Sequence, residues 1–316
     1  MIADTEHGAA DNHTRRTRLL SSLAVVIVAM VVVAAVTSAG DNKLSLGEAI
    51  LLGIVEGVTE YLPVSSTAHL AVVQDALGLT SSNDGQRAAD AYAIVIQIGA
   101  IAAVAGLYRN RLVSLSTSLL RRRRAGNSAA FALVAAFTPA AVIGLVFGDL
   151  IKDRLFSTWP IVAAWVVGAF ALLWPRLTTP SGHRPFESLT MRDGLIIGLA
   201  QTLALWPGTS RSLVTILAAL AVGLTLSAAV EFSFLLGLIT LGAATAYQLF
   251  VDGEVILQQF GLLSTLAGVT TAAATAWAAV RWMVGYLEKH PLAVFGYYRL
   301  CIAALVTVVA VVTSAG

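Results

Sequence analysis

The chain has 316 residues, of which 57% are hydrophobic and 12% charged, and its formal net charge is +2. Its mean hydropathy is +0.81, whereas a soluble domain usually carries about 25% charged residues. This composition excludes an ordinary water-soluble domain. Cys301 is the only cysteine, which excludes an intrachain disulfide and a metal site built from cysteines.

Apolar runs long enough to cross a membrane recur along the whole chain. A helix needs about 20 such residues to cross the hydrocarbon, and helices satisfy their own backbone hydrogen bonds there. The runs lack the alternation of an outer-membrane barrel. The sequence therefore predicts an all-α polytopic membrane protein with spans near residues 19–39, 91–108, 130–148, 158–175, 230–251, 262–282 and 296–314.

The basic residues are distributed unevenly between the loops. Segments assigned to the inside hold Arg15, Arg16, Arg18, Arg109, Arg111, Arg121 to Arg124, Arg176, Arg184, Arg192, Arg281 and Lys289, and those outside hold Lys43, Arg87, Lys152 and Arg154. Because cytoplasmic loops concentrate Lys and Arg, this predicts a cytoplasmic N-terminus. Residues 1–43 are interpreted as a tail and an extra anchor, with a signal peptide as the alternative, and residues 44–316 as the membrane domain.

Two stretches, residues 47–77 and 193–223, are apolar enough to enter the membrane but are broken by proline, glycine and polar side chains. With one gap allowed they resemble each other. Each has a glycine, an acidic or amide residue three positions later, an apolar turn, a proline and a hydroxyl cluster. This predicts two re-entrant hairpins that enter from opposite sides as an inverted repeat, with their breaks meeting near the middle of the bilayer.

Glu56 and Glu60 stand four residues apart in the first stretch, so a helix places both carboxylates on one face. Such a pair can share a proton or hold Mg²⁺ or Ca²⁺. The alternative is an interfacial pair that faces water.

The hydroxyl cluster after Pro63 suggests a nucleophile and its helper. His69 stands three and four residues from Ser66 and Ser65, within reach of a local contact between serine and imidazole. The alternative is a histidine that hydrogen-bonds a backbone carbonyl.

Arg211 in the second stretch indicates an anion site, because an arginine inside an apolar segment is costly and marks a functional site by default. Pro207-Gly208 ends one helix and Ser210-Arg211-Ser212 opens the next, so backbone N–H groups, hydroxyls and a guanidinium converge there. The planar guanidinium suits phosphate. The alternative is that Arg211 only neutralises Glu56 or Glu60.

These motifs are similar to those of the bacterial undecaprenyl-diphosphatases, also called bacitracin-resistance proteins. The resemblance covers about residues 44–314. It rests on Glu56-Gly-Val-Thr-Glu60-Tyr-Leu-Pro-Val-Ser65-Ser66-Thr67-Ala-His69 and Leu205-Trp-Pro207-Gly-Thr-Ser210-Arg211-Ser212-Leu-Val-Thr215, with shorter matches around Gln97, Pro139 and Glu231 and at Tyr298-Arg299.

The resemblance implies six core spans and two re-entrant hairpins in inverted repeat, beside which the N-terminal span is extra. It implies an enzyme of the cytoplasmic membrane, with an outward-facing site, that removes the terminal phosphate of a C55 polyprenyl diphosphate and recycles the lipid carrier for cell-wall synthesis. A divalent cation, Mg²⁺ or Ca²⁺, is implied as cofactor. The expected partners are the polyprenyl diphosphate and membrane lipids, with a homodimer as one option and no nucleic acid.

Carried onto the matching positions, the resemblance and the residues together give three groups of site residues. The catalytic candidates are Glu56, Glu60, Ser66, His69 and Arg211; the phosphate-binding candidates are Ser65, Thr67, Ser210, Ser212 and Thr215; and the candidate metal ligands are Glu56 and Glu60.

Four positions depart from the family pattern, which usually has glycine at Ala68 and Leu213, proline at Ile239 and arginine at Leu226. Leu213 lies two residues from Arg211, so an effect on the loop or on pocket width is expected there first. The competing classes are a polyprenyl-phosphate transporter and an inactive binding homologue. A transporter needs an anion clamp, but not a serine, a histidine and two carboxylates beside it.

Overall fold

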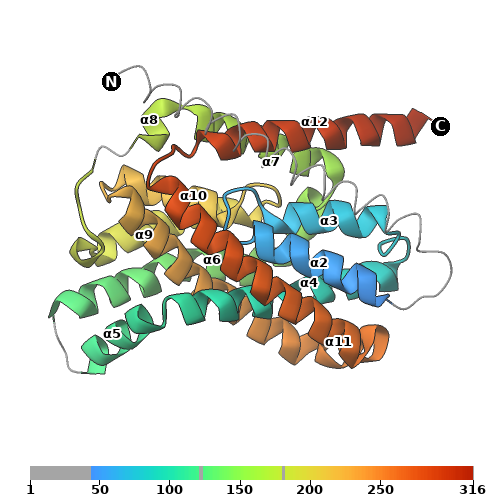
Figure 1. The fold of residues 1–316 in the computed structure, drawn as a ribbon, viewed down its shortest axis with the longest axis horizontal. Helices are drawn as coiled ribbons and strands as arrows, with labels where there is room; N and C mark the ends of the chain where they lie inside the picture. Colours follow the sequence, from blue (N-terminus) through green and yellow to red (C-terminus); the bar gives the residue numbers. More distant parts are fainter. Residues whose placement is uncertain (1–43, 121–123, 180–181, 316) are drawn as a thin grey trace, which may run out of the picture.

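The structure, a computed structural model, describes residues 44–120, 124–179 and 182–315. These residues form helices and short 3₁₀ turns, with no strand among them (Figure 1). The predicted span at residues 19–39 lies outside the described residues. The elements are α2 (Leu46–Thr59), α3 (Ser66–Ala76), α4 (Asn83–Leu107), α5 (Arg109–Leu120), α6 (Arg124–Leu155), α7 (Thr158–Leu173), α8 (Pro175–Thr178), η1 (Phe186–Ser188), α9 (Met191–Gln201), η2 (Thr202–Leu205), α10 (Arg211–Ala221), α11 (Leu226–Leu287) and α12 (Ala293–Ala315).

Among the residues that the structure describes, five helical segments are long and apolar enough to cross a membrane. They are Gly85–Leu107, Ser128–Leu155, Leu226–Val251, Leu262–Leu287 and Ala293–Thr313, and they cover five of the predicted spans. The span predicted at residues 158–175 is shorter in the structure, because α7 has 16 residues and ends before Pro175. Proline cannot continue the hydrogen bonding of a helix interior, and it restricts the residue before it. The fold is all-α and polytopic, as predicted.

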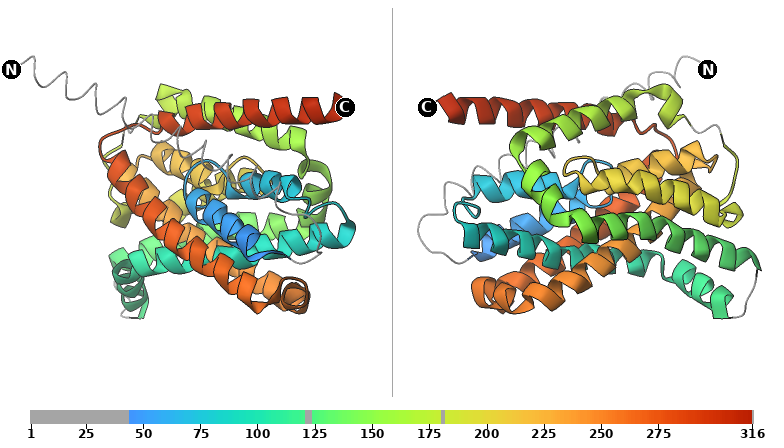
Figure 2. Two further views of the ribbon diagram at one scale, coloured as in Figure 1. Left: turned by 45° about the vertical axis from the view of Figure 1, so that its right-hand side comes forward. Right: turned by 180° about the vertical axis from the view of Figure 1, so that it is seen from behind.

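Helix α11 contains two spans although its helical hydrogen bonding is continuous over 62 residues. Thr245 in its first half donates a hydrogen bond to Gln97 of α4, and a Cβ added at Gly99 of α4 would touch the carbonyl of Val269 in its second half. A straight helix would separate positions 245 and 269 by about 36 Å. The chain therefore turns back within α11, as Figures 1 and 2 show.

The two polar stretches form helix–break–helix hairpins, α2–α3 and α9–η2–α10, and the breaks lie near the middle of the molecule (Figures 1 and 2). Each break ends on a serine with positive φ, 74° at Ser65 and 73° at Ser210, and these are the non-glycine residues with positive φ in the described chain. The left-handed region disfavours side chains with a Cβ. The same unusual backbone at the same point of each hairpin supports the inverted repeat.

Close packing of small residues holds each hairpin against a long helix. A Cβ added at Gly57 of α2 would lie 2.3 Å from the carbonyl oxygen of Ala272 in α11, and one added at Gly198 of α9 would lie 2.4 Å from the carbonyl oxygen of Ala136 in α6. Small residues let helix backbones approach closely in membrane proteins. The first helix of each hairpin is thus seated against a longer, apolar helix.

Candidate active site

The first hairpin presents two buried carboxylates from the end of α2. Glu56 is 1% exposed and Glu60, the residue that caps the C-terminus of α2, is 8% exposed. One helical turn separates them, so both lie on the same side of the helix. This burial excludes the alternative of an interfacial pair that faces water.

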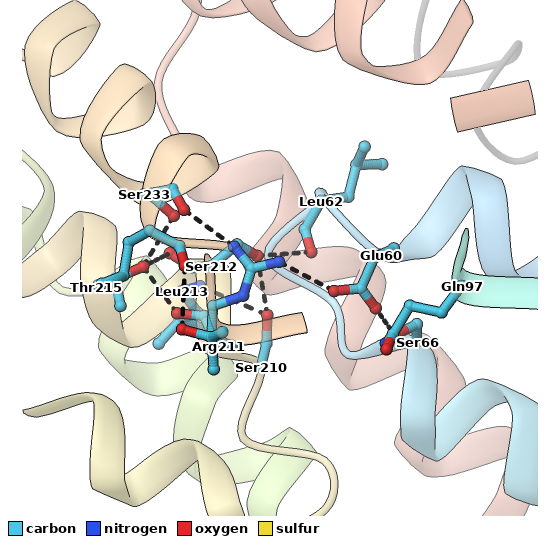
Figure 3. Close-up of polar contacts among 12 residues, drawn as sticks. Glu60, Leu62, Ser66, Gln97, Ser210, Arg211, Ser212, Leu213, Thr215 and Ser233 are labelled. Atoms are coloured by element: carbon cyan, nitrogen blue, oxygen red, sulfur yellow. Dashed lines mark hydrogen bonds and ion pairs between the residues drawn. The ribbon is translucent and has the colours of Figure 1, made fainter. Parts of the chain in front are cut away.

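Glu60 bonds a residue of each hairpin, one through each of its carboxylate oxygens (Figure 3). Its Oε2 accepts a hydrogen bond from the hydroxyl of Ser66, the first residue of α3. Its Oε1 accepts from Nη2 of Arg211 at 2.9 Å, with 6% of the Glu60 side chain and 10% of the Arg211 side chain exposed. The structure therefore contains the Arg211–Glu60 ion pair that the sequence left as an alternative, and it adds a serine to the same carboxylate.

Arg211 opens α10 directly after the strained Ser210, whose hydroxyl accepts a hydrogen bond from the N–H of Leu213. Its Nη1 donates to the backbone oxygen of Ser233 at 3.0 Å, and its Cζ lies 5.3 Å from the ring centroid of Tyr61. The guanidinium thus lies between the first hairpin and the first half of α11. Leu213 itself is buried in the main hydrophobic cluster, 3% exposed.

The three candidate hydroxyls of the second hairpin lie within hydrogen-bond distance of other groups in the protein. Ser212 donates to the backbone oxygen of Leu62 at 2.9 Å, and its hydroxyl lies 3.1 Å from that of Ser210. The Thr215 hydroxyl lies 2.7 Å from the hydroxyl of Ser233 (Figure 3). These bonds make the three candidates part of the scaffold around Arg211.

The imidazole of His69 makes no hydrogen bond with Ser66. Its Nδ1 lies 2.7 Å from the backbone oxygen of Ser65, and its Nε2 lies 2.8 Å from the hydroxyl of Tyr298. A carbonyl oxygen only accepts, so Nδ1 carries the hydrogen. Of the two arrangements that the sequence left open, the structure therefore shows the histidine bonded to a backbone carbonyl.

Two further candidates lie at different places in the first hairpin. The hydroxyl of Ser65 accepts a hydrogen bond from the N–H of Gly208 at 3.2 Å, so it connects the two breaks. Thr67 is exposed on α3, and no hydrogen bond joins its side chain to another described residue. The structure thus brings Ser65 to the junction and leaves Thr67 outside it.

Three buried polar atoms at this junction have no hydrogen-bond partner among the described residues: Glu56 Oε1, the Tyr61 hydroxyl and Arg211 Nε. A buried polar group without a partner costs about 1–3 kcal/mol, and native proteins contain few of them. One acceptor and two groups able to donate therefore indicate a place where a polar ligand binds. No group of three or more His, Cys, Asp or Glu residues in the described chain is arranged to hold a metal by itself.

Several residues of this region escaped the sequence analysis. Tyr61 and Ser233 lie inside motifs that were recognised, but neither residue type indicates a role without the geometry. Arg299 is an arginine in an apolar stretch, the same signal that indicates an anion site at Arg211, and it belongs to the Tyr298-Arg299 match with the family. The rule that marks an intramembrane arginine as functional would have found it.

Known protein families and individual proteins resemble this chain over most of its length. The family described as "Bacitracin resistance protein BacA" matches residues 49–305, within the predicted membrane domain. The chain belongs to the BacA family. An undecaprenyl-diphosphatase of Sorangium cellulosum is 41% identical over 264 residues, covering 82% of this chain and 84% of that protein. Undecaprenyl-diphosphatase 2 of Rhodospirillum rubrum is 40% identical over 265 residues, covering 82% and 93%. The BacA match includes the first hairpin from residue 49 onward and the whole second hairpin.

Proposed function

We propose that this protein hydrolyses undecaprenyl diphosphate to undecaprenyl phosphate and inorganic phosphate, and so recycles the lipid carrier for cell-wall synthesis and confers resistance to bacitracin. Membership of the BacA family and relatives named undecaprenyl-diphosphatase support this activity. The observation that carries it is the carboxylate of Glu60, which bonds both the Ser66 hydroxyl and the Arg211 guanidinium. A hydroxyl on a carboxylate beside a phosphate-binding cation is suited to phosphoryl transfer.

Glu60 acts as the base in this proposal. When the Ser66 oxygen attacks the terminal phosphorus, a new O–P bond forms, the bond from phosphorus to the bridging oxygen breaks, and the serine proton passes to Glu60. Polyprenyl phosphate leaves, and Glu60 passes its proton to solvent. Water then attacks the serine phosphate: a new O–P bond to water forms, the bond from phosphorus to Ser66 breaks, inorganic phosphate is released, and a water proton returns to the Ser66 oxygen through Glu60. In the alternative, Ser66 and Glu60 orient a water that attacks directly and gives its proton to Glu60. Both routes use the same geometry.

Arg211 binds the terminal phosphate in either route. Its two Nη groups already bond Glu60 and Ser233, which fixes the plane of the guanidinium, and Nε, buried and unpaired, is a donor for a phosphate oxygen. A donor held in place before the reaction stabilises developing charge without reorganisation. His69, bonded at both nitrogens to Ser65 and Tyr298, is assigned a supporting role at the start of α3 and not that of nucleophile.

We further propose that a divalent cation, Mg²⁺ or Ca²⁺, binds with Glu56 as its protein ligand. The Oε1 of Glu56 is buried without a partner, whereas both oxygens of Glu60 are occupied by Ser66 and Arg211. Magnesium sites commonly use one or two carboxylates and complete their coordination with water and substrate phosphates. When bound, the cation would neutralise charge on the diphosphate.

We also propose that the N-terminus is cytoplasmic, that the site faces the outside, and that the protein forms a homodimer. Arg111, which follows α4, pairs at 2.6 Å with Glu187 in the loop before α9 and at 2.6 Å with Glu231 near the start of α11. These three segments thus lie together, which supports their common assignment to the cytoplasm. A reporter fused after Gly126 is expected to be cytoplasmic, and a periplasmic reporter would overturn the topology. A homodimer is checked by the mass of the protein–detergent complex.

The proposed activity is tested by phosphate release from undecaprenyl diphosphate by the detergent-purified protein with Mg²⁺ or Ca²⁺. Ser66→Ala and Arg211→Ala are expected to abolish most of the rate, whereas Ser116→Ala, which changes an exposed serine on α5, is expected to retain it. No release by the intact protein with either cation, combined with retained binding of polyprenyl phosphate, would contradict hydrolysis and favour a transporter or an inactive binding homologue.

A further inference from the structure

Arg299 on α12 is a second arginine buried in the membrane domain, and the proposed chemistry does not use it. It is 0% exposed, and none of the ion pairs in the described chain involves it. A buried charge without a counter-ion is costly unless several hydrogen bonds satisfy it. Its retention therefore requires a structural or functional explanation.

The guanidinium of Arg299 donates to four backbone carbonyls in three parts of the chain. Nη1 bonds Pro63 at 3.2 Å in the first hairpin, and Nη2 bonds Gly208 at 2.6 Å in the second. Nε bonds Trp165 at 3.2 Å and Nη2 also bonds Ala164 at 2.8 Å, both in α7. One side chain thus connects both breaks to α7.

The two hairpin contacts of Arg299 are equivalent positions of the repeat. Pro63 lies two residues before the strained Ser65, and Gly208 lies two residues before the strained Ser210. Both pairs are separated by 145 positions (208 − 63 and 210 − 65). Because Arg299 bonds the same carbonyl in each half, it lies where the two halves of the repeat meet.

The surroundings leave space for the guanidinium. A Cβ added at Gly168 of α7 would lie 2.2 Å from Arg299 Nη2, so the glycine makes room for the side chain. The indole of Trp165 donates to the backbone oxygen of Val64 at 2.9 Å, and Ser65 accepts from the N–H of Gly208. These bonds fix the remaining backbone of the two breaks around the arginine.

We propose that Arg299 is a positioning residue that sets the register between the two hairpins, so that the Ser66–Glu60 half of the site faces the Arg211 half. Glu60 ends α2 three residues before Pro63, and Arg211 begins α10 three residues after Gly208. A shift of one break relative to the other therefore changes the Glu60–Arg211 geometry. Lysine cannot replace the arginine, because one ammonium does not reach four carbonyls on three segments.

The inference rests on the proposed hydrolysis, and the experiment separates the two. Phosphate release by Arg299→Lys and Gly168→Ala is measured with kcat and KM per folded molecule, where folding is assessed by thermal unfolding in detergent. Arg281→Lys, on an exposed arginine of α11, and Gly285→Ala, where an added Cβ meets nothing within 4 Å, are the matched controls. Inactive wild-type protein contradicts the proposed function itself.

We expect kcat to fall about 10- to 100-fold in both test variants, because a displacement near 1 Å can cost about a hundredfold in rate. KM is expected to stay within about threefold, because Arg299 bonds backbone and not substrate. Unchanged kcat, an equal change in the controls, or a rate loss fully explained by loss of folded protein in both variants would overturn the positioning role.

Discussion

Glu60→Gln is the substitution that most directly perturbs the connection between the two hairpins. Glutamine keeps an oxygen that can accept from Arg211, but it replaces the oxygen that accepts from Ser66 by an amide N–H₂ donor, and it removes the negative charge. The ion pair is almost fully buried, with 6% of the Glu60 side chain and 10% of the Arg211 side chain exposed. Arg211 then loses its ion-pair partner.

This change affects both the stability of the fold and the rate of hydrolysis. Removing one partner of a buried ion pair costs about 3–5 kcal/mol, and the surviving hydrogen bond to glutamine reduces that loss of stability. Removing a positioned base lowers a rate by about 10²- to 10⁴-fold. We therefore expect folded protein with a lower unfolding temperature and a kcat reduced at least a hundredfold.

The assay is phosphate release beside thermal unfolding, with Glu48→Gln as the matched control. Glu48 is a buried glutamate on the same helix, but it caps the N-terminus of α2, where it accepts from the N–H of Ser45 at 2.7 Å. Glutamine also serves in a capping box. Retention of more than a tenth of the rate by Glu60→Gln, or an equal loss in Glu48→Gln, would refute the assignment of Glu60 as base.

Three further predictions concern stability. Gly57→Ala is expected to destabilise the folded protein by about 1–3 kcal/mol, because the added methyl group overpacks against α11. Gly47→Ala, where an added Cβ meets nothing within 4 Å, is expected to leave the stability unchanged. Equal unfolding temperatures of the two variants would contradict this prediction. Tyr61→Phe removes a buried hydroxyl without a partner, so the unfolding temperature without substrate should not fall, and a clear decrease would contradict its lack of a partner. Asp193 lies in the first turn of α9. Burial raises its pKa, but hydrogen bonds from Arg184 and Thr190 have the larger combined effect and hold the pKa at about 2, below the ordinary 3.8. The interaction of Asp193 with Arg184 therefore stabilises the fold above pH 3.8, and this stabilisation is lost as the pH falls toward 2. Between these pH values the unfolding temperature of Asp193→Asn should fall less than that of the wild type. An equal fall in both proteins would contradict the prediction.

The apolar runs predicted the spans because a helix that crosses lipid needs about 20 consecutive apolar residues, and such runs can be read from the sequence. Their ends were less predictable. The α7 span is shorter than its apolar run because Pro175 stops the helix. The segment after α4 was assigned to a loop from its arginines, but Arg109–Leu120 is helical. Charge indicates the side of the membrane and does not exclude a helix.

The two hairpins were predicted, but their register was not. The sequence aligned Pro63 with Pro207, which required a gap. The structure aligns the two serines with positive φ, so Pro63 corresponds to Gly208 and no gap is needed. Backbone conformation at Ser65 and Ser210 leaves no mark in residue type, because serine is common in every kind of loop.

Only part of the candidate site could be predicted from the sequence, and the reason is physical. Charged groups inside apolar segments stand out in a sequence, so Glu60 and Arg211 were found before any contact was known. Contacts between backbone and side chain do not stand out. For this reason the partners of His69 and the four carbonyls bonded by Arg299 could be identified only from the structure.

The central claim is that the two hairpins build one hydrolytic site, and a double-mutant cycle on phosphate release from undecaprenyl diphosphate tests it most directly. Ser66→Ala removes the hydroxyl of the first hairpin and Arg211→Ala the guanidinium of the second. Residues that act as a unit are strongly non-additive. We predict that each single variant loses nearly all of the rate and that the double variant loses little more. Losses that multiply independently, or a single variant that keeps the wild-type rate, would contradict a shared site.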